Sequence, residues 1–101
     1  MQTSNNPTAA ANTPSIANGA TALASNPGRI GWQIQNVGTN PLFVLLGTGA
    51  SSTVYHIVLK GGTGNSDGLG AFYSQMAGTV YTGVITIAGT SPLYTVTELG
   101  L

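Results

Sequence analysis

The hydrophobic positions between residues 29 and 59 follow the two-residue period of β-strands. In Arg29–Asn36 every second residue is large and apolar, which predicts a strand with one buried face. Leu42–Leu46 is apolar at every position, as expected of a strand that is covered on both faces. Val54–Leu59 is rich in β-branched and aromatic residues, which favour strands. The pattern therefore predicts three strands in this region.

Three more strands are expected after the glycine-rich segment 60–70. They are Ala71–Gln75, Thr79–Ala88 and Leu93–Leu99, and Gly83 within the second indicates a bulge or a bend at a sheet corner. Glycine, proline, asparagine and serine gather between these segments and predict turns. No segment has the period of a helix. Strands at a spacing of roughly 8–12 residues favour an all-β fold, either a sandwich or a barrel.

The first 25 residues have a different composition, rich in alanine, asparagine, threonine, serine and proline. Such a segment does not bury enough apolar surface to fold alone. Ile16 and Leu23 are its only sizeable apolar residues, and Pro7 and Pro14 favour extended backbone around them. We therefore expect an extended N-terminal arm over residues 1–25, lying on a neighbouring subunit, and a β-sandwich core over residues 26–101.

Charge is scarce in this chain. Charged residues make up 4% of the sequence and the formal net charge is zero, whereas about 25% is usual in soluble domains. A net charge near zero promotes association. A small core is marginally stable alone, and the absence of cysteine excludes disulfides and thiolate metal sites as staples. These features predict a homo-oligomer whose surface is covered by other protein.

The same composition argues against several classes of partner. No basic patch is present to neutralise phosphates, so nucleic-acid binding is not expected. The longest apolar run, Leu42–Leu46, is far shorter than the ~20 residues that cross a bilayer. The N-terminal segment lacks the basic and apolar regions of a secretory signal. We expect a soluble chain without a leader that binds no membrane.

Candidate catalytic residues are few and isolated. His56 is the only histidine and lies in an apolar strand segment, where a solvent-facing or interface position is favoured over a catalytic one. At an interface its titration would tune assembly. Asp67 and Glu98 are the only carboxylates for a glycosidase pair, and nothing in the sequence brings them together. The loop Gly61–Gly64 lacks the Lys-Ser/Thr ending and the helix of a phosphate-binding loop. We therefore predict no enzyme, cofactor or metal site.

Two other groups of residues have open interpretations. Arg29 and Glu98 lie in the first and last strands of the expected core, where they form either a cross-strand ion pair or two solvated charges. The aromatic residues form either a stacking platform for sugars or, more simply, parts of the core and of subunit interfaces. These aromatic residues are Trp32, Phe43, Tyr55, Phe72, Tyr73, Tyr81 and Tyr94.

From residue 26 onward, roughly three quarters of the chain resembles a class of small virion proteins of tailed bacteriophages. The shared features are an Asn-Pro-x-Arg turn, an Ile-Gln-Asn strand, a Gly-Thr-Asn-Pro-Leu turn, a Tyr-Thr-Gly turn and a terminal Thr-Glu. They correspond here to Asn26, Pro27, Arg29, Ile34, Gln35, Asn36, Asn40, Pro41, Gly47, Tyr81, Thr82, Gly83 and Glu98. Most are turn residues, so they bear on fold more than on role.

The resemblance implies a jelly-roll-like antiparallel β-sandwich that acts as a capsid decoration, or cement, protein. Such proteins form trimers on the capsid surface, so we expect a homotrimer, made in the bacterial cytoplasm and bound to the major capsid protein of the virion. The arm residues Pro7, Pro14, Ile16 and Leu23 would contact the capsid. The strand faces that pack between subunits are expected to carry Phe43, Leu45, Tyr55, Ile57 and Tyr81.

Other roles remain open from the sequence. The main alternative is a glycan-binding head-fibre or tail-fibre domain, an adhesin that uses aromatic residues and the loop Gly61–Gly70. An exposed aromatic pair beside polar groups would favour it. A tail-tube or collar component is a further possibility, whereas a virion-associated hydrolase lacks an acid–base constellation.

Overall fold

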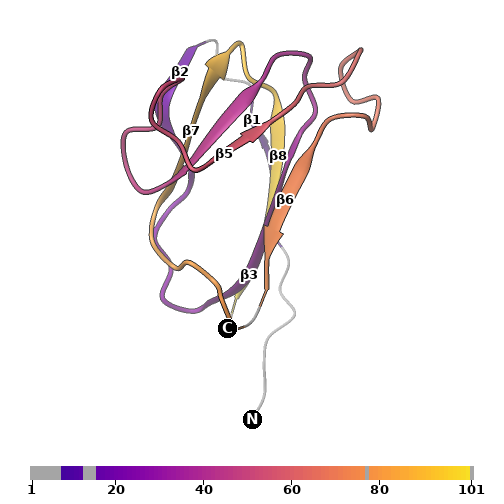
Figure 1. The fold of residues 1–101 in the computed structure, drawn as a ribbon. Coiled ribbons are helices and arrows are strands. Elements are labelled where there is room, and N and C mark those ends of the chain that lie inside the picture. Colours follow the sequence, from indigo (N-terminus) through magenta and orange to yellow (C-terminus); the bar gives the residue numbers. More distant parts are fainter. Residues whose placement is uncertain (1–7, 13–15, 77, 101) are drawn as a thin grey trace.

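The computed structural model describes the backbone of residues 8–12, 16–76 and 78–100, with side chains from residue 19 onward. Eight strands form two four-stranded antiparallel sheets, and the described residues contain no helix (Figure 1). The first sheet has the order β1 (Thr8–Asn12), β8 (Tyr94–Gly100), β3 (Arg29–Asn36) and β6 (Phe72–Gln75). The second has the order β2 (Ile16–Leu23), β7 (Ile85–Thr90), β4 (Leu42–Leu46) and β5 (Ile57–Leu59). The predicted all-β class is confirmed.

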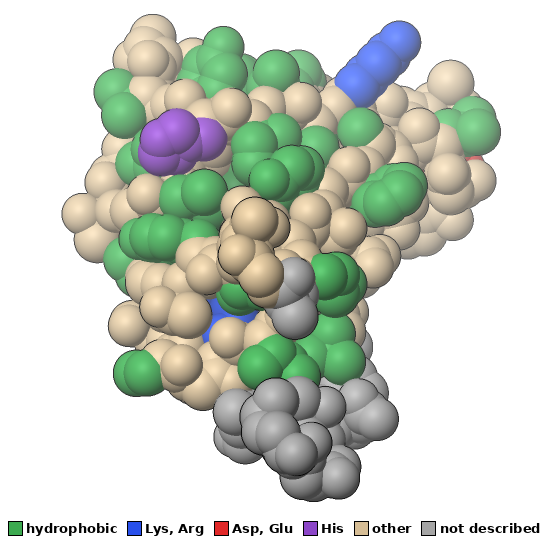
Figure 2. Space-filling view, turned by 60° about the horizontal axis from the view of Figure 1, so that its bottom comes forward, with side chains coloured by type: hydrophobic (Ala, Val, Ile, Leu, Met, Phe, Trp, Pro, Cys, Tyr) green, Lys and Arg blue, Asp and Glu red, His purple; other side chains and the backbone are tan. Residues whose placement is uncertain are grey.

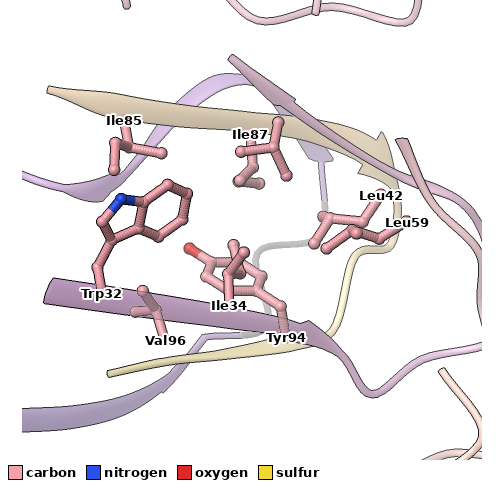
Figure 3. Close-up of a cluster of buried hydrophobic side chains, with 9 residues drawn as sticks. Trp32, Ile34, Leu42, Leu59, Ile85, Ile87, Tyr94 and Val96 are labelled. Carbon is pink, nitrogen blue, oxygen red and sulfur yellow. The ribbon is translucent and has the colours of Figure 1, made fainter. Parts of the chain in front are cut away.

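The core lies between the two sheets. Alternate residues of β3 and β8 point inward and meet the inward residues of β4, β5 and β7 (Figure 3). The indole of Trp32 extends toward Ile85, and its N–H donates to Gln75 Oε1 at 2.9 Å. The two-residue period therefore places one face of each strand in the core. The buried set is Trp32, Ile34, Leu42, Val44, Leu59, Ile85, Ile87, Tyr94 and Val96.

Two predicted strands, β3 and β4, have the expected bounds, and two others are shorter than expected. The strand expected over Val54–Leu59 is only Ile57–Leu59, because the backbone of Val54 exchanges hydrogen bonds with Ser51 in a turn. The strand expected over Thr79–Ala88 starts at Ile85. The carbonyls of the segment before it bind the Arg29 side chain and the Asn26 N–H instead of forming a strand ladder.

The described part of the expected arm over residues 1–25 contains two strands. Thr8–Asn12 pairs with β8 in regular antiparallel register, and Ile16–Leu23 pairs with β7 with two register shifts. The described part of the expected arm therefore belongs to the two sheets, where backbone hydrogen bonds to β7 and β8 hold it. Small residues suffice for such pairing, since the ladder bonds come from the main chain. Pro7 and Pro14 lie outside the described residues.

Candidate functional surface

The outer faces of the two sheets differ in chemistry. On the β1-β8-β3-β6 sheet, the residues that alternate with the core residues of β3 and β8 are mostly uncharged and polar, whereas the β6 edge carries the exposed Phe72 and Met76. The polar residues of this face include Gln33, Gln35, Ser74, Thr95 and Thr97. This composition is typical of a sheet face that stays in contact with water.

The outer face of the other sheet is apolar. Leu45, Ala50 and Ala88 are buried there in a second small cluster, and Phe43 packs against it. The rings of Phe43 and Tyr55 are in contact, with centroids 5.0 Å apart and planes tilted by 50°. Val58, the cross-strand partner of Phe43, is exposed, as is Val54. We call Phe43, Val54, Tyr55 and Val58 the apolar surface.

The loop from Gly47 to His56 folds back over this face and holds Tyr55 in place. The Thr86 hydroxyl accepts a hydrogen bond from the Ala50 N–H at 3.2 Å and donates one to the Gly47 carbonyl at 2.7 Å. At the end of the loop, His56 donates its backbone N–H to the Val44 carbonyl at 2.8 Å, and its Nδ1 accepts the Leu46 N–H at 3.1 Å. His56 is thus a loop contact at the surface, with backbone partners.

The expected subunit-contact residues divide into three groups. Phe43 and Tyr55 belong to the apolar surface, and Tyr55 is 42% exposed. Leu45 is buried beneath it. Ile57 and Tyr81 instead pack against the main core, because they follow the inward period of β5 and the segment before β7. Their side chains therefore contribute to the core, and their contact with another subunit stays a prediction.

The remaining aromatic residues do not form a platform. Trp32 and Tyr94 are fully buried. Tyr73 packs on Trp32, with ring centroids 5.7 Å apart. Phe72 is exposed at the sheet edge formed by β6, away from the apolar surface. Phe43 and Tyr55 are thus the aromatic contact at the surface among the residues that the structure describes.

Arg29 and Glu98 form the expected ion pair, and it is largely buried. Arg29 Nε lies 2.7 Å from Glu98 Oε2, with side-chain exposures of 0% for Arg29 and 21% for Glu98. The other guanidinium nitrogens donate to backbone carbonyls, at 2.8 Å to Tyr81, 2.9 Å to Gly83 and 2.6 Å to Ala24. The side chain therefore ties the segments after β2 and before β7 to β8 and β3 at one end of the sandwich.

The Asn-Pro-x-Arg turn and the Tyr-Thr-Gly segment lie against each other here. Three successive carbonyls of the Tyr-Thr-Gly segment accept hydrogen bonds from the Asn-Pro-x-Arg turn. The Thr82 carbonyl accepts the Asn26 N–H at 2.8 Å, between the two carbonyls that Arg29 binds. Asn26 also stabilises its own turn, because its Oδ1 accepts the Gly28 N–H at 3.0 Å. The two motifs are thus complementary halves of one structural contact.

Asn36 has a corresponding role at the other end of β3. It is fully buried, and its Nδ2 donates to the Asn40 carbonyl at 2.8 Å and to the Leu59 carbonyl at 2.9 Å. Its Oδ1 accepts the Gly38 N–H at 2.9 Å. Gly70 packs so closely that an added Cβ would overlap the Asn36 carbonyl oxygen. The amide therefore joins the β3–β4 turn to the end of β5.

The glycine-rich loop between β5 and β6 is organised by the carboxylate of Asp67. Asp67 Oδ2 accepts the backbone N–H of Thr63 and of Gly64 at 2.9 and 2.8 Å and the Thr63 hydroxyl at 2.9 Å. Oδ1 accepts the Leu69 N–H at 2.9 Å. Gly62 lies against this carboxylate, and a Cβ there would overlap it. Both carboxylate oxygens of Asp67 thus accept hydrogen bonds from its own loop, whereas the carboxylate of Glu98 is bound by Arg29.

These hydrogen bonds lower the pKa of Asp67 from 3.8 to about 2, with the Leu69 and Gly64 N–H groups as the largest causes. Because the folded pKa is below the unfolded value, the contribution of Asp67 to loop order is complete above about pH 4. It is lost as the pH falls through about 2. We expect the amide resonances of Gly64 and Leu69 to shift together in this window, as measured by NMR.

Asp67→Asn should remove that titration and raise the hydrogen-exchange rates of the same amides. Asn65→Ala, in the same loop, is the matched control and should leave both unchanged. Amides that titrate in the Asp67→Asn variant as in the wild type would show that another group is responsible.

Few charged groups reach the surface of the described part of the chain. Arg29 is buried and Glu98 is paired, which leaves Lys60 and Asp67 as the exposed charged residues. Figure 2 accordingly shows a face on which hydrophobic and uncharged polar side chains predominate. Within the described ranges, no group of three or more potential metal ligands is found. No helix there is long and apolar enough to cross a membrane.

The expected arm residues are only partly placed. Leu23, in β2, is partly buried and packs against the main core, and its contact with a capsid stays a prediction. Ile16 is the first residue of β2, and its side chain lies outside the described residues.

Comparisons of the chain with protein-family models, with curated proteins and with solved structures gave no match.

Proposed function

We propose that this protein is a non-enzymatic capsid decoration protein with a jelly-roll fold. The order of the strands supports the fold proposal, because β1-β8-β3-β6 opposite β2-β7-β4-β5 is the arrangement of an eight-stranded jelly roll. That architecture is used by viral capsid domains, though also by lectins and cupins. Role therefore has to be argued from the surface and not from the fold.

The observation that carries the proposed role is the difference between the two outer faces. An apolar surface on one face, and an opposite face that is polar and uncharged away from the β6 edge, suit a subunit that attaches to a larger protein assembly by one side. In this proposal the apolar surface contacts the major capsid protein, while the face of Gln33 and Thr97 remains in water. The protein would then clamp neighbouring capsomers against the pressure of the packaged DNA.

Electron microscopy of virions labelled with antibody against this chain tests the location. Label spread over the head is the expected result. Label confined to the tail, the collar or one vertex would contradict the decoration role. Virions that lack the chain should release their DNA at a lower temperature than wild-type virions, which tests the stabilising role separately.

Attachment to undecorated heads is expected to depend on the apolar surface and not on salt. Burial of an aromatic side chain contributes roughly 1.5–3 kcal/mol, so Tyr55→Ser should weaken attachment about tenfold or more. Gln33→Ser, on the opposite face, is the control and should have no effect. Because the apolar surface contains no charge, raising the salt concentration should change attachment less than twofold. These affinities are measurable by cosedimentation with heads.

A glycan-binding adhesin is the second candidate, and the contact between Phe43 and Tyr55 favours it specifically. Ser51, whose hydroxyl bonds with that of Thr53, lies in the same loop as Tyr55 and adds hydroxyl groups to it. Aromatic rings beside hydroxyls suit the apolar faces of sugars. Binding of the purified protein to host cells, lost in Tyr55→Ser, would support this role over decoration.

A further inference from the structure

One edge of the β1-β8-β3-β6 sheet is formed by β6, which pairs only with β3 among the described strands. The register is regular, with Ile34 opposite Tyr73 and Trp32 opposite Gln75. The Asn36 N–H donates to the Ala71 carbonyl, so odd-numbered residues of this segment direct their backbone groups toward β3. The N–H and C=O groups of Phe72 and Ser74 therefore point away from the sheet, where a further strand would bind.

Apart from its short length of four residues, this edge lacks the features by which proteins prevent strand addition. Short length, lysine, proline and bulges are the usual protections. The second sheet has such protections at both edges, since β2 carries two register shifts and β5 is three residues long and followed by Lys60. By contrast, β6 (FYSQ) has no charge, no proline and no register shift. An unprotected edge in a natural protein is normally covered.

The side chains along this edge indicate what covers it. Phe72 and Met76 are 63% and 50% exposed and lie two residues before and after Ser74. All three are on the outer face, and the Met76 sulfur lies over Gly31, where it would come within 2.8 Å of an added Cβ. An antiparallel copy of the same strand, centred on Ser74, would therefore bring the Phe72 of each subunit opposite the partner's Met76.

We infer that β6 pairs with β6 of a second copy of this chain about a two-fold axis at Ser74. Residues that lie opposite each other in an antiparallel pair must have their side chains on the same face of the sheet. The two-fold axis must therefore place one residue opposite its own copy, because an axis between two neighbouring residues would pair side chains from different faces. An axis at Tyr73 would also satisfy backbone groups, but it would place Phe72 opposite the partner's Ser74 and leave the exposed Met76 without an apolar contact, so the axis at Ser74 is favoured. At Ser74 the free N–H and C=O bond with those of the partner's Ser74, and the two sheets join into one of eight strands. This pairing uses a surface separate from the apolar surface and does not depend on a capsid role.

Charged substitutions at Ser74 test this inference in the full chain. Wild-type protein should have twice the monomer mass of 10.1 kDa in light-scattering measurements. Ser74→Lys and Ser74→Glu should each be monomeric, because like charges would lie directly opposite each other. An equimolar mixture of the two variants should recover the dimer. Gln33→Lys, on the same face but within the sheet, is the control and should remain dimeric.

A cross-link provides a second measurement that does not depend on the loss of the dimer. Opposed Cα atoms in a hydrogen-bonded pair are about 5.5 Å apart, which a disulfide can span. Because the chain has no cysteine, Ser74→Cys should give one covalent dimer on oxidation, whereas Gln33→Cys should not. A wild-type monomer, the trimer expected from the resemblance, or a dimer that persists in Ser74→Lys and fails to cross-link would each overturn the inference. Antibody label on the tail would overturn the decoration role and leave the pairing intact.

Discussion

Arg29→Met is expected to lower the free energy of unfolding by about 4 kcal/mol, near the middle of the range for loss of one partner of a buried ion pair. The guanidinium is fully buried and bonds Glu98 and three backbone carbonyls. The variant leaves these carbonyls without their donor. Glu98 is 21% exposed and regains some water, which keeps the loss below the upper end of the range. Denaturant unfolding followed by tryptophan fluorescence measures the change, since Trp32 is in the core.

Lys60→Met is the matched control, because it removes the other cation from an exposed position. Its effect should be within about 0.5 kcal/mol, as for most surface substitutions. Glu98→Gln keeps an acceptor for Arg29 Nε and should fall between the two. An Arg29→Met variant as stable as Lys60→Met would show that the carbonyl contacts contribute nothing to stability.

Asn36→Asp is expected to lower the free energy of unfolding by about 3 kcal/mol at neutral pH, the cost of leaving buried polar groups unsatisfied. The shape of the side chain hardly changes, and the acceptor for the Gly38 N–H remains. The two donor bonds to Asn40 and Leu59 are lost, and a carboxylate faces their carbonyl oxygens. The fold would favour the protonated acid, so its pKa in the folded state lies above the unfolded value.

The pH dependence separates this explanation from a simple packing defect. A raised folded pKa means that the loss of stability is smallest at low pH and grows as the pH rises through that pKa. Unfolding curves at pH 4 and pH 7 measure it. Asn40→Ala removes an exposed amide that donates to the Thr90 carbonyl and should cost less than about 1 kcal/mol at either pH. An equal deficit for Asn36→Asp at both pH values would contradict the proposed cause.

Much of the fold follows from the apolar pattern. The bounds of β3 and β4 match the prediction because the apolar residues on which the prediction rests are the ones that the fold buries. The strand preference of the individual residues gave a wrong prediction for Val54–His56, because this β-branched and aromatic segment forms a turn over the sheet. It failed again for β1 and β2, whose small residues have no strand signal of their own. Their partners, β8 and β7, are distant in sequence, and no local pattern encodes that pairing.

The residues of the apolar surface and the buried polar residues Arg29 and Asn36 were predictable to different degrees. Phe43 and Tyr55 stand out as apolar residues beyond what the core needs, whereas the inward direction of Ile57 depends on the register of β5. The burial of Arg29 does not follow from alternation, since a register shift between Arg29 and Gly31 changes its direction. Asn36 was missed, although it continues the inward period of Trp32 and Ile34. A polar residue at an inward position signals a buried hydrogen-bonding group.

The pairing of the first strands with the last has a consequence for biosynthesis. Thr8 lies opposite Glu98, 90 residues later (98 minus 8). At roughly 5–20 residues per second, several seconds of translation separate β1 from its partner on the ribosome. The β1-β8-β3-β6 sheet cannot be completed before then, and the other sheet has to wait for β7. Folds dominated by such distant contacts form slowly, in roughly milliseconds to seconds. The early strands therefore stay unpaired until the late strands have been made, and a chaperone that shields them during this time would increase the yield of folded protein.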